Sequence, residues 1–150
     1  MNAEDAVVTR LRSAFGAADP VPHHALDAAL ASLSWRDPDS ALAELVGDSL
    51  TDPAGVRNRS DTGPRLLTFE GDHLVVEVEV SDLGGAHRLL GQLVPPQPAE
   101  VEVRWRGGSL RAAADQLGRF RAASVPPGPI SISCRLTEPS RLVSTSWVTV

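Results

Sequence analysis

Two short segments of the chain carry glutamates at alternating positions, Glu77 and Glu79 in the first and Glu100 and Glu102 in the second. Two neighbouring carboxylates can act together as a general acid and a general base. In both segments, however, valines occupy the positions between the glutamates, and this alternation is typical of a strand with one buried and one solvated face. We therefore interpret the glutamates as the polar side of a sheet, balanced by arginines on neighbouring strands.

The histidines and the single cysteine do not have the spacing of a metal site. His23 and His24 are adjacent, so on a helix their side chains would point about 100° apart. His73 and His87 fall in separate β segments, and Cys134 alone can form neither a Cys-x-x-Cys motif nor an intramolecular disulfide. The sequence therefore predicts no metal ion and no cofactor.

Motifs of nucleophilic catalysis and phosphate binding are also absent from the sequence. There is no Gly-x-Ser-x-Gly motif, and Gly107-Gly108-Ser109 is typical of a hairpin turn. Aspartates at expected loop ends offer ligands that suit Ca²⁺, but turn formation explains them better; they are Asp72, Asp82 and Asp115. We predict no catalytic residues and a protein that is not an enzyme.

The composition is that of a small globular protein with an uneven charge. The 150 residues are 42% hydrophobic but only 4% aromatic, so the core must be built from Leu, Val, Ile and Ala. Residues 1–63 hold five arginines and ten acidic residues, a net charge of 5 − 10 = −5, and residues 64–150 hold nine of each. This acidity disfavours direct nucleic-acid binding and suits a basic protein partner, or else a solvated helical face.

Sequence features also give an expectation for location. A lone cysteine agrees with a reducing compartment, and the acidic start Met-Asn-Ala-Glu-Asp does not resemble a signal peptide. No apolar run approaches the ~20 residues that span a bilayer. We therefore expect a cytoplasmic protein that does not interact with membranes.

The first third of the chain has the periodicity of short helices. Apolar residues recur three and four positions apart in residues 4–18, 22–33 and 38–50, which predicts three helices in an acidic segment of residues 1–50. Turn-forming residues dominate residues 51–64, so we expect a linker there.

The Trp-Arg pair at the end of the second predicted helix is the best candidate for a contact with a partner. Trp and Arg dominate the energetics of protein interfaces, although a Trp here can equally pack the helices onto the rest of the chain. The predicted partner-binding surface comprises Trp35, Arg36, Asp37, Leu42, Glu44 and Leu45.

The period changes to two in residues 65–150. About eight short strands at intervals of roughly 8–12 residues predict an antiparallel β-sandwich, and hence an α+β chain with a short helical segment first. Residues 115–136 organise this part as strand, corner and strand, with Phe120, Ala122 and Ser124 on one face. The corner is Val125-Pro126-Pro127-Gly128.

These residues carry a family resemblance. Residues 73–150 resemble a carboxypeptidase regulatory-like domain, a transthyretin-like (prealbumin-like) sandwich of about seven to eight strands. The matching pieces, in order, are Leu90-Gly91-Gln92-Leu93-Val94-Pro95, Ala99-Glu100-Val101-Glu102-Val103, Asp115 through Gly118-Arg119-Phe120, and the Val-Pro-Pro-Gly corner. The resemblance implies glycines with positive φ at the turns, a Phe between the sheets, and a scaffold or binding role without catalysis.

The whole chain also resembles small actinobacterial proteins that accompany extracytoplasmic-function sigma factors. The pieces are Ala18-Asp19-Pro20-Val21-Pro22, Leu33-Ser34-Trp35-Arg36, Leu42-Ala43-Glu44-Leu45 and Gly91-Gln92-Leu93-Val94-Pro95-Pro96. This resemblance implies a regulatory, protein-binding role, with a sigma factor or another basic protein as partner. The alternative is an accessory domain that binds carbohydrate or another small ligand.

Overall fold

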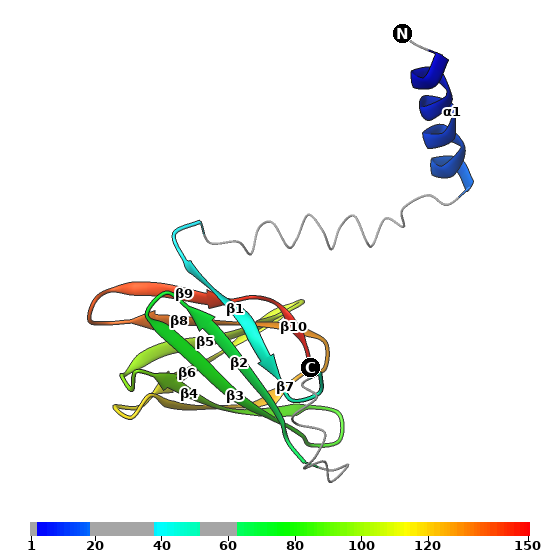
Figure 1. Ribbon diagram of the computed structural model, residues 1–150. Coiled ribbons are helices and arrows are strands. Elements are labelled where there is room, and N and C mark those ends of the chain that lie inside the picture. Colours follow the sequence, from blue (N-terminus) through cyan, green and yellow to red (C-terminus); the bar gives the residue numbers. More distant parts are fainter. Residues whose placement is uncertain (1–2, 19–37, 52–62) are drawn as a thin grey trace. The chain divides into compact units, whose positions relative to one another are not determined.

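The computed structural model describes residues 3–18, 38–51 and 63–150. The chain divides into two compact units, Met1–Pro38 and Asp39–Val150. Figure 1 shows the helix that residues 3–18 form in the first unit and a strongly twisted sheet in the second. The second predicted helix, residues 22–33, lies outside the described residues, as do most of the linker and the Trp-Arg pair.

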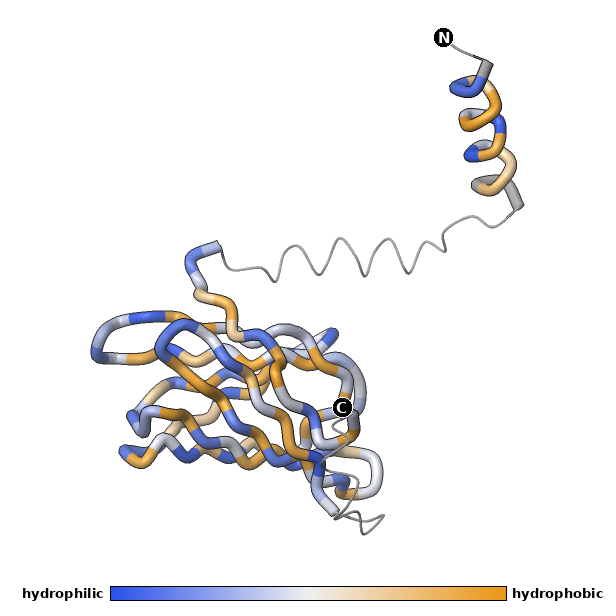
Figure 2. The backbone as a smooth tube through the Cα atoms, in the orientation of Figure 1, coloured by the Kyte–Doolittle hydropathy of each residue, from blue (hydrophilic) through white to orange (hydrophobic). Residues whose placement is uncertain are grey.

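The helix of the first unit, α1 (Ala3–Ala18), confirms the first helix expected from the sequence. Glu4 and Asp5 occupy its first turn, where negative charge is stabilised by the helix dipole. Its apolar residues, among them Leu11 and Phe15, are exposed. Figure 2 shows them as hydrophobic segments between polar ones along the helix.

The second unit is a sheet of ten strands. They are β1 (Ala41–Asp48), β2 (Arg65–Gly71), β3 (Leu74–Asp82), β4 (His87–Val94), β5 (Ala99–Trp105), β6 (Gly108–Ala114), β7 (Arg119–Val125), β8 (Pro129–Leu136), β9 (Arg141–Thr145) and β10 (Val148–Thr149). The strand order is β6-β5-β8-β9-β1-β2-β3-β4-β7, with β10 paired to β8. Because the terminal strands β6 and β7 are joined by a tight turn, the sheet curls nearly into a barrel (Figure 1).

β1 joins the two halves of this sheet. Its first residues pair in parallel with β9, and its last residues pair antiparallel with β2. The other neighbouring strands pair antiparallel. We call β6, β5, β8, β9 and β10 the β5 half, and β2, β3, β4 and β7 the β3 half.

The third predicted helix is wrong, because residues 41–48 form strand β1. The same residues contain a second pattern, with Ala41, Ala43 and Leu45 facing the core. Leu42, which lies between two of these residues, is therefore on the opposite face and is exposed. Pairing with strands on both sides outweighs the weak helix propensity of this segment, so the β unit begins well before residue 65.

The predicted strands after residue 65 match the structure closely. β2 and β3 form a hairpin whose turn falls on Asp72 and His73. The end of the chain forms two strands, β9 and β10, which Ser146 and Trp147 separate.

The strand–corner–strand segment carries the chain from one half of the sheet to the other. β7 pairs with β4 in the β3 half, and β8 pairs with β5 in the β5 half. Phe120 and Ala122 of β7 face the core as expected, but Ser124 does not. Ser124 has φ 62° and is exposed, and the next residue, Val125, is buried in its place. This irregularity coincides with a register shift against β4, and Gly128 completes the corner with φ 125°.

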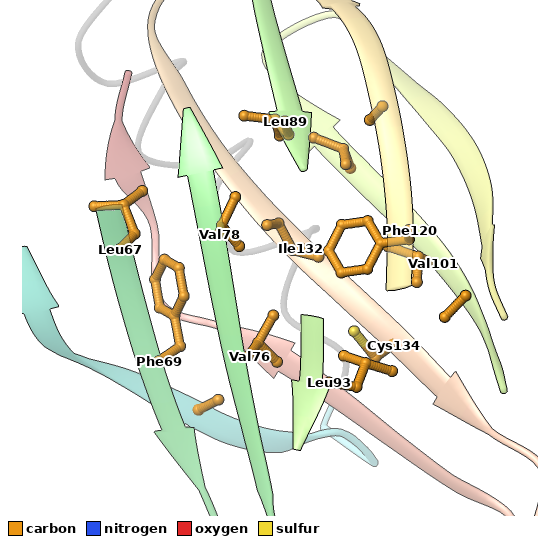
Figure 3. Close-up of a cluster of buried hydrophobic side chains, with 14 of the residues drawn as sticks. Leu67, Phe69, Val76, Val78, Leu89, Leu93, Val101, Phe120, Ile132 and Cys134 are labelled. Atoms are coloured by element: carbon orange, nitrogen blue, oxygen red, sulfur yellow. The ribbon is translucent and has the colours of Figure 1, made fainter. Parts of the chain in front are cut away.

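The core lies between the two halves and is almost entirely aliphatic. Figure 3 shows Phe120 from β7, Val101 from β5 and Ile132 from β8 pointing into the same interior. Cys134 is buried there, as expected, and burial raises the pKa of its thiol to about 12. The thiolate is therefore scarce near neutral pH, and Cys134 acts as a small apolar residue.

A bidentate ion pair fastens β1 to its neighbours. Arg65 donates from Nε and Nη2 to the two carboxylate oxygens of Asp48, at 3.0 and 2.6 Å. Its Nη1 also donates to the carbonyl oxygen of Thr149 at 2.7 Å. A single partly buried side chain thus links β1, β2 and β10.

Among the described residues, no helix is long and apolar enough to cross a membrane.

Candidate functional site

The outer surface of the β3 half and β1 carries glutamates and leucines side by side. Glu44 on β1 lies directly opposite Glu70 on β2, and Glu77 and Glu79 lie on the next strand, β3. We call this surface the acidic face. It is formed by Leu42, Glu44, Leu66, Glu70, Glu77, Glu79 and Leu90.

The leucines of the acidic face are open to solvent. Leu42 is 56% exposed and Leu66 is 54% exposed, while Leu90 is 39% exposed. Glu79 lies between Leu66 and Leu90 in the register of β2, β3 and β4. Apolar side chains thus alternate with carboxylates across three strands.

The four glutamates of the acidic face are not engaged in ion pairs within the part of the chain that the structure describes. The nearest arginine in register is Arg88 on β4, which lies opposite Ser81 and diagonally across from Glu79, while Arg119 and Arg121 lie on β7, two strands away from β3. Like charges placed directly opposite each other, as Glu44 and Glu70 are, destabilise a sheet.

The predicted partner-binding residues are only partly placed by the structure. Trp35, Arg36 and Asp37 lie outside the described residues. Leu42 and Glu44 both lie on the acidic face, whereas Leu45 points inward and packs against the core. The prediction that Leu42 and Leu45 share one surface is wrong, because successive residues of a strand alternate between its two faces.

The outer surface of the β5 half has a different chemistry, because its charges are paired. Glu102 accepts hydrogen bonds from Arg104 Nε at 2.8 Å and from Ser109 Oγ at 2.9 Å. The guanidinium groups of Arg111 and Arg135 lie on either side of β5, each 3.9 Å from a glutamate. An open concavity of about 450 Å³ lies among these side chains.

Glu102 has an environment that keeps it ionised. The hydrogen bond from Arg104 lowers the pKa of its carboxyl below the ordinary value of 4.5, burial opposes this, and the Ser109 bond and the charges of Arg104 and Arg111 lower it further. A general acid needs a raised pKa. Glu102 is therefore in the wrong environment for that role.

Replacing Glu102 by glutamine should destabilise the protein in a pH-dependent way. Because the folded pKa of Glu102 is lowered, its contribution is fully present above pH 4.5 and is lost as the pH falls through the folded value. We expect the variant to be about 1 kcal/mol less stable at pH 7 and the gap to close in acid. Urea unfolding at several pH values measures this difference in the free energy of unfolding. Glu77→Gln, which changes an exposed glutamate, serves as the control. A gap that persists below the folded pKa would contradict the assignment.

Metal-binding groups do not gather on either surface. In residues 3–18, 38–51 and 63–150, no three His, Cys, Asp or Glu side chains are placed to hold one ion. The chemistry that both surfaces offer is therefore that of charge and apolar contact.

The acidic face was not predicted from the sequence, but one signal for it exists. In a half-buried strand, apolar residues alternate with polar ones, and the doublets Leu66-Leu67 and Leu89-Leu90 break that rule. One leucine of each pair is buried, so the other must be exposed.

Comparison with known proteins yields no match to this chain, whether with protein-family models, curated proteins or solved structures. The residues of the two surfaces are thus the basis for inferring function.

Proposed function

We propose that this protein is a non-enzymatic regulatory module that binds another protein through its acidic face. The observation that carries the proposal is the combination of exposed leucines with four glutamates that form no ion pair among the described residues. A purely solvated sheet face needs neither feature. Apolar contact provides affinity at an interface, and uncompensated charge selects the partner and speeds its association.

The partner is a basic protein surface in which arginine or lysine side chains lie next to apolar ones. Such a surface places a cation between Glu44 and Glu70, where it relieves their mutual repulsion. A sigma factor of the extracytoplasmic-function type is the candidate that the sequence resemblance nominates. The net negative charge disfavours direct contact with nucleic acid, and the single cysteine favours a cytoplasmic location.

We also propose that the β unit is an antiparallel transthyretin-like sandwich of the carboxypeptidase regulatory-like kind. Support comes from the corner between β7 and β8, which carries the chain from one half of the sheet to the other. The Phe120 ring packs over Gly91, where the resemblance expects a Phe between two sheets. β1 is then an additional strand inserted between β9 and β2.

Reversing the charge of the acidic face should abolish partner binding. We expect Glu77→Arg/Glu79→Arg to weaken binding to an extracytoplasmic-function sigma factor of the same organism by at least tenfold, because close charge pairs at an interface contribute roughly 1.5 kcal/mol or more each. A pull-down with purified proteins at two salt concentrations measures this. Glu138→Arg, in the β8–β9 turn, carries the same kind of reversal away from the face and should bind normally. Equal binding by all three proteins would refute the role of the face.

A further inference from the structure

We propose that the concavity on the β5 half binds the oxyanion group of a small molecule, a phosphate or a carboxylate, between Arg111 and Arg135. This site lies on the half of the sheet that does not carry the acidic face. The inference goes beyond protein binding and does not depend on it.

Strand register fixes the two arginines around the concavity. Arg111 on β6 lies opposite Glu102 of β5, and Arg135 on β8 lies opposite Glu100 of β5. The two arginines therefore lie on opposite sides of β5. Along that strand they are offset by two residues, the spacing between the outward-facing Glu100 and Glu102. Long side chains so placed can both reach a group lying over β5.

The two arginines hold their present partners loosely. The separation from Arg111 Nε to Glu102 is 3.9 Å, as is the separation from Arg135 Nε to Glu100, which is longer than a charge-assisted hydrogen bond. Arg111 is 89% exposed and Arg135 is 63% exposed, so most of their guanidinium N–H groups are free to meet a ligand. Arg104, by contrast, is already engaged by Glu102 at 2.8 Å.

The charge balance favours an anion. The lining contains three arginines and two glutamates, a sum of 3 − 2 = +1. Glu102 is already neutralised by its hydrogen bonds with Arg104 and Ser109. Glu100 is 86% exposed, and an incoming oxyanion that accepts two N–H groups from a guanidinium is a stronger partner for Arg135.

The floor of the concavity adds a hydroxyl group. Ser133 Oγ and Ser144 Oγ lie 2.7 Å apart, so one hydroxyl donates to the other, and the accepting hydroxyl keeps a proton to donate elsewhere. No aromatic side chain lines this concavity, so a neutral sugar has no ring to stack on. The volume of about 450 Å³ is in the range of small-molecule sites.

A titration followed by NMR tests the site. Inorganic phosphate, citrate and neutral glucose are added separately to the ¹⁵N-labelled full chain at constant ionic strength. We expect phosphate or citrate, but not glucose, to shift the amide signals of Ala112, Ala113 and Ser133 in a saturable way. A response to phosphate alone identifies a phosphate site, and a response to citrate alone identifies a carboxylate site.

Variants distinguish anion binding in the concavity from nonspecific attraction to the charged surface. Arg111→Gln and Arg135→Gln should each weaken anion binding about tenfold, whereas Arg121→Gln, an exposed arginine on β7, should not change it. Glu100→Gln should strengthen binding by a few fold, because it removes the competing carboxylate. Absence of saturable shifts overturns the proposal. Equal weakening by Arg121→Gln also overturns it, since that result means nonspecific attraction to surface charge. Weaker binding by Glu100→Gln overturns it too, since Glu100 would then support the anion rather than compete with it for Arg135.

Discussion

Replacing Gly91 by alanine is expected to destabilise the protein by about 3 kcal/mol, at the upper end of what overpacking a core typically costs. Gly91 lies on β4 directly opposite Phe120 of β7. A Cβ atom added there would lie 2.0 Å from Cζ of the Phe120 ring. That ring is buried in a packed core, so it cannot move aside without displacing its neighbours.

A double-mutant cycle isolates this contact. Phe120→Leu shortens the side chain over Gly91, so alanine at position 91 should cost less in that background, by at least 1 kcal/mol. Urea unfolding of the two single variants and the double variant gives the coupling. Gly47→Ala serves as a control, because its Cβ would meet only the Thr68 side chain, 3.3 Å away at the nearest atom. Strictly additive effects would mean that the Phe120 ring does not limit the size of the side chain at position 91.

The second large effect is expected at Gly118, where alanine should cost about 3 kcal/mol. Gly118 has φ +74°, a conformation that residues with a Cβ rarely adopt, and the added Cβ would lie 2.7 Å from the carbonyl oxygen of Leu93. That carbonyl is part of the backbone of β4 and cannot rotate away. Gly118 also accepts a hydrogen bond from the Leu93 amide at 2.9 Å, so a shift of the turn breaks the link to β4.

Gly84 provides a matched control for Gly118. Its φ is +80°, but an added Cβ would meet nothing within 4 Å. Gly84→Ala should therefore cost only the conformational part, about 1 kcal/mol, and the difference between the two variants in urea unfolding measures the clash with Leu93. Similar losses at both positions would show that the clash is relieved.

Both glycines act where the curled sheet is joined across β4, β7 and the turn before β7. Asp115 Oδ1 accepts hydrogen bonds from the amides of Leu117 and Arg119, each at 2.9 Å, and its carbonyl accepts one from Gly118 at 2.8 Å. This turn brings the chain from β6, at one end of the strand order, to β7 at the other. Gly118 lets the turn approach the backbone of β4, and Gly91 lets the Phe120 ring pack against β4. Both contacts help to close the curled sheet.

Much of the sheet could be predicted because its strands bury one face. In β3 and β5, valine alternates with a polar residue, and a slip of one position would expose every valine, so the pattern determines both strand and orientation. β1 could not be predicted in this way. Its inward residues include Ala41 and Ala43, which are too small to give a strong signal, while Leu42 and Leu45 match a helical spacing.

The acidic face needs strand order, which local sequence does not contain. Glu44 and Glu70 are far apart in the chain and meet only because β1 inserts next to β2. The predicted partner-binding surface includes Leu42 and Glu44, but the sequence pattern assigns both to a helix. The concavity likewise depends on β6 and β8 flanking β5, and β8 reaches β5 only after the chain has passed through β7 in the other half of the sheet.

Site-specific photo-cross-linking from the acidic face is the most direct test of the proposed function. A photoreactive phenylalanine replaces Leu66, which lies opposite Glu79, and in a control protein it replaces Ser109 on the β5 half. In living cells we predict a cross-linked protein from position 66 alone, attached through a basic segment, and its loss on Glu77→Arg/Glu79→Arg. A product that survives the charge reversal, or that forms equally from position 109, would contradict the account.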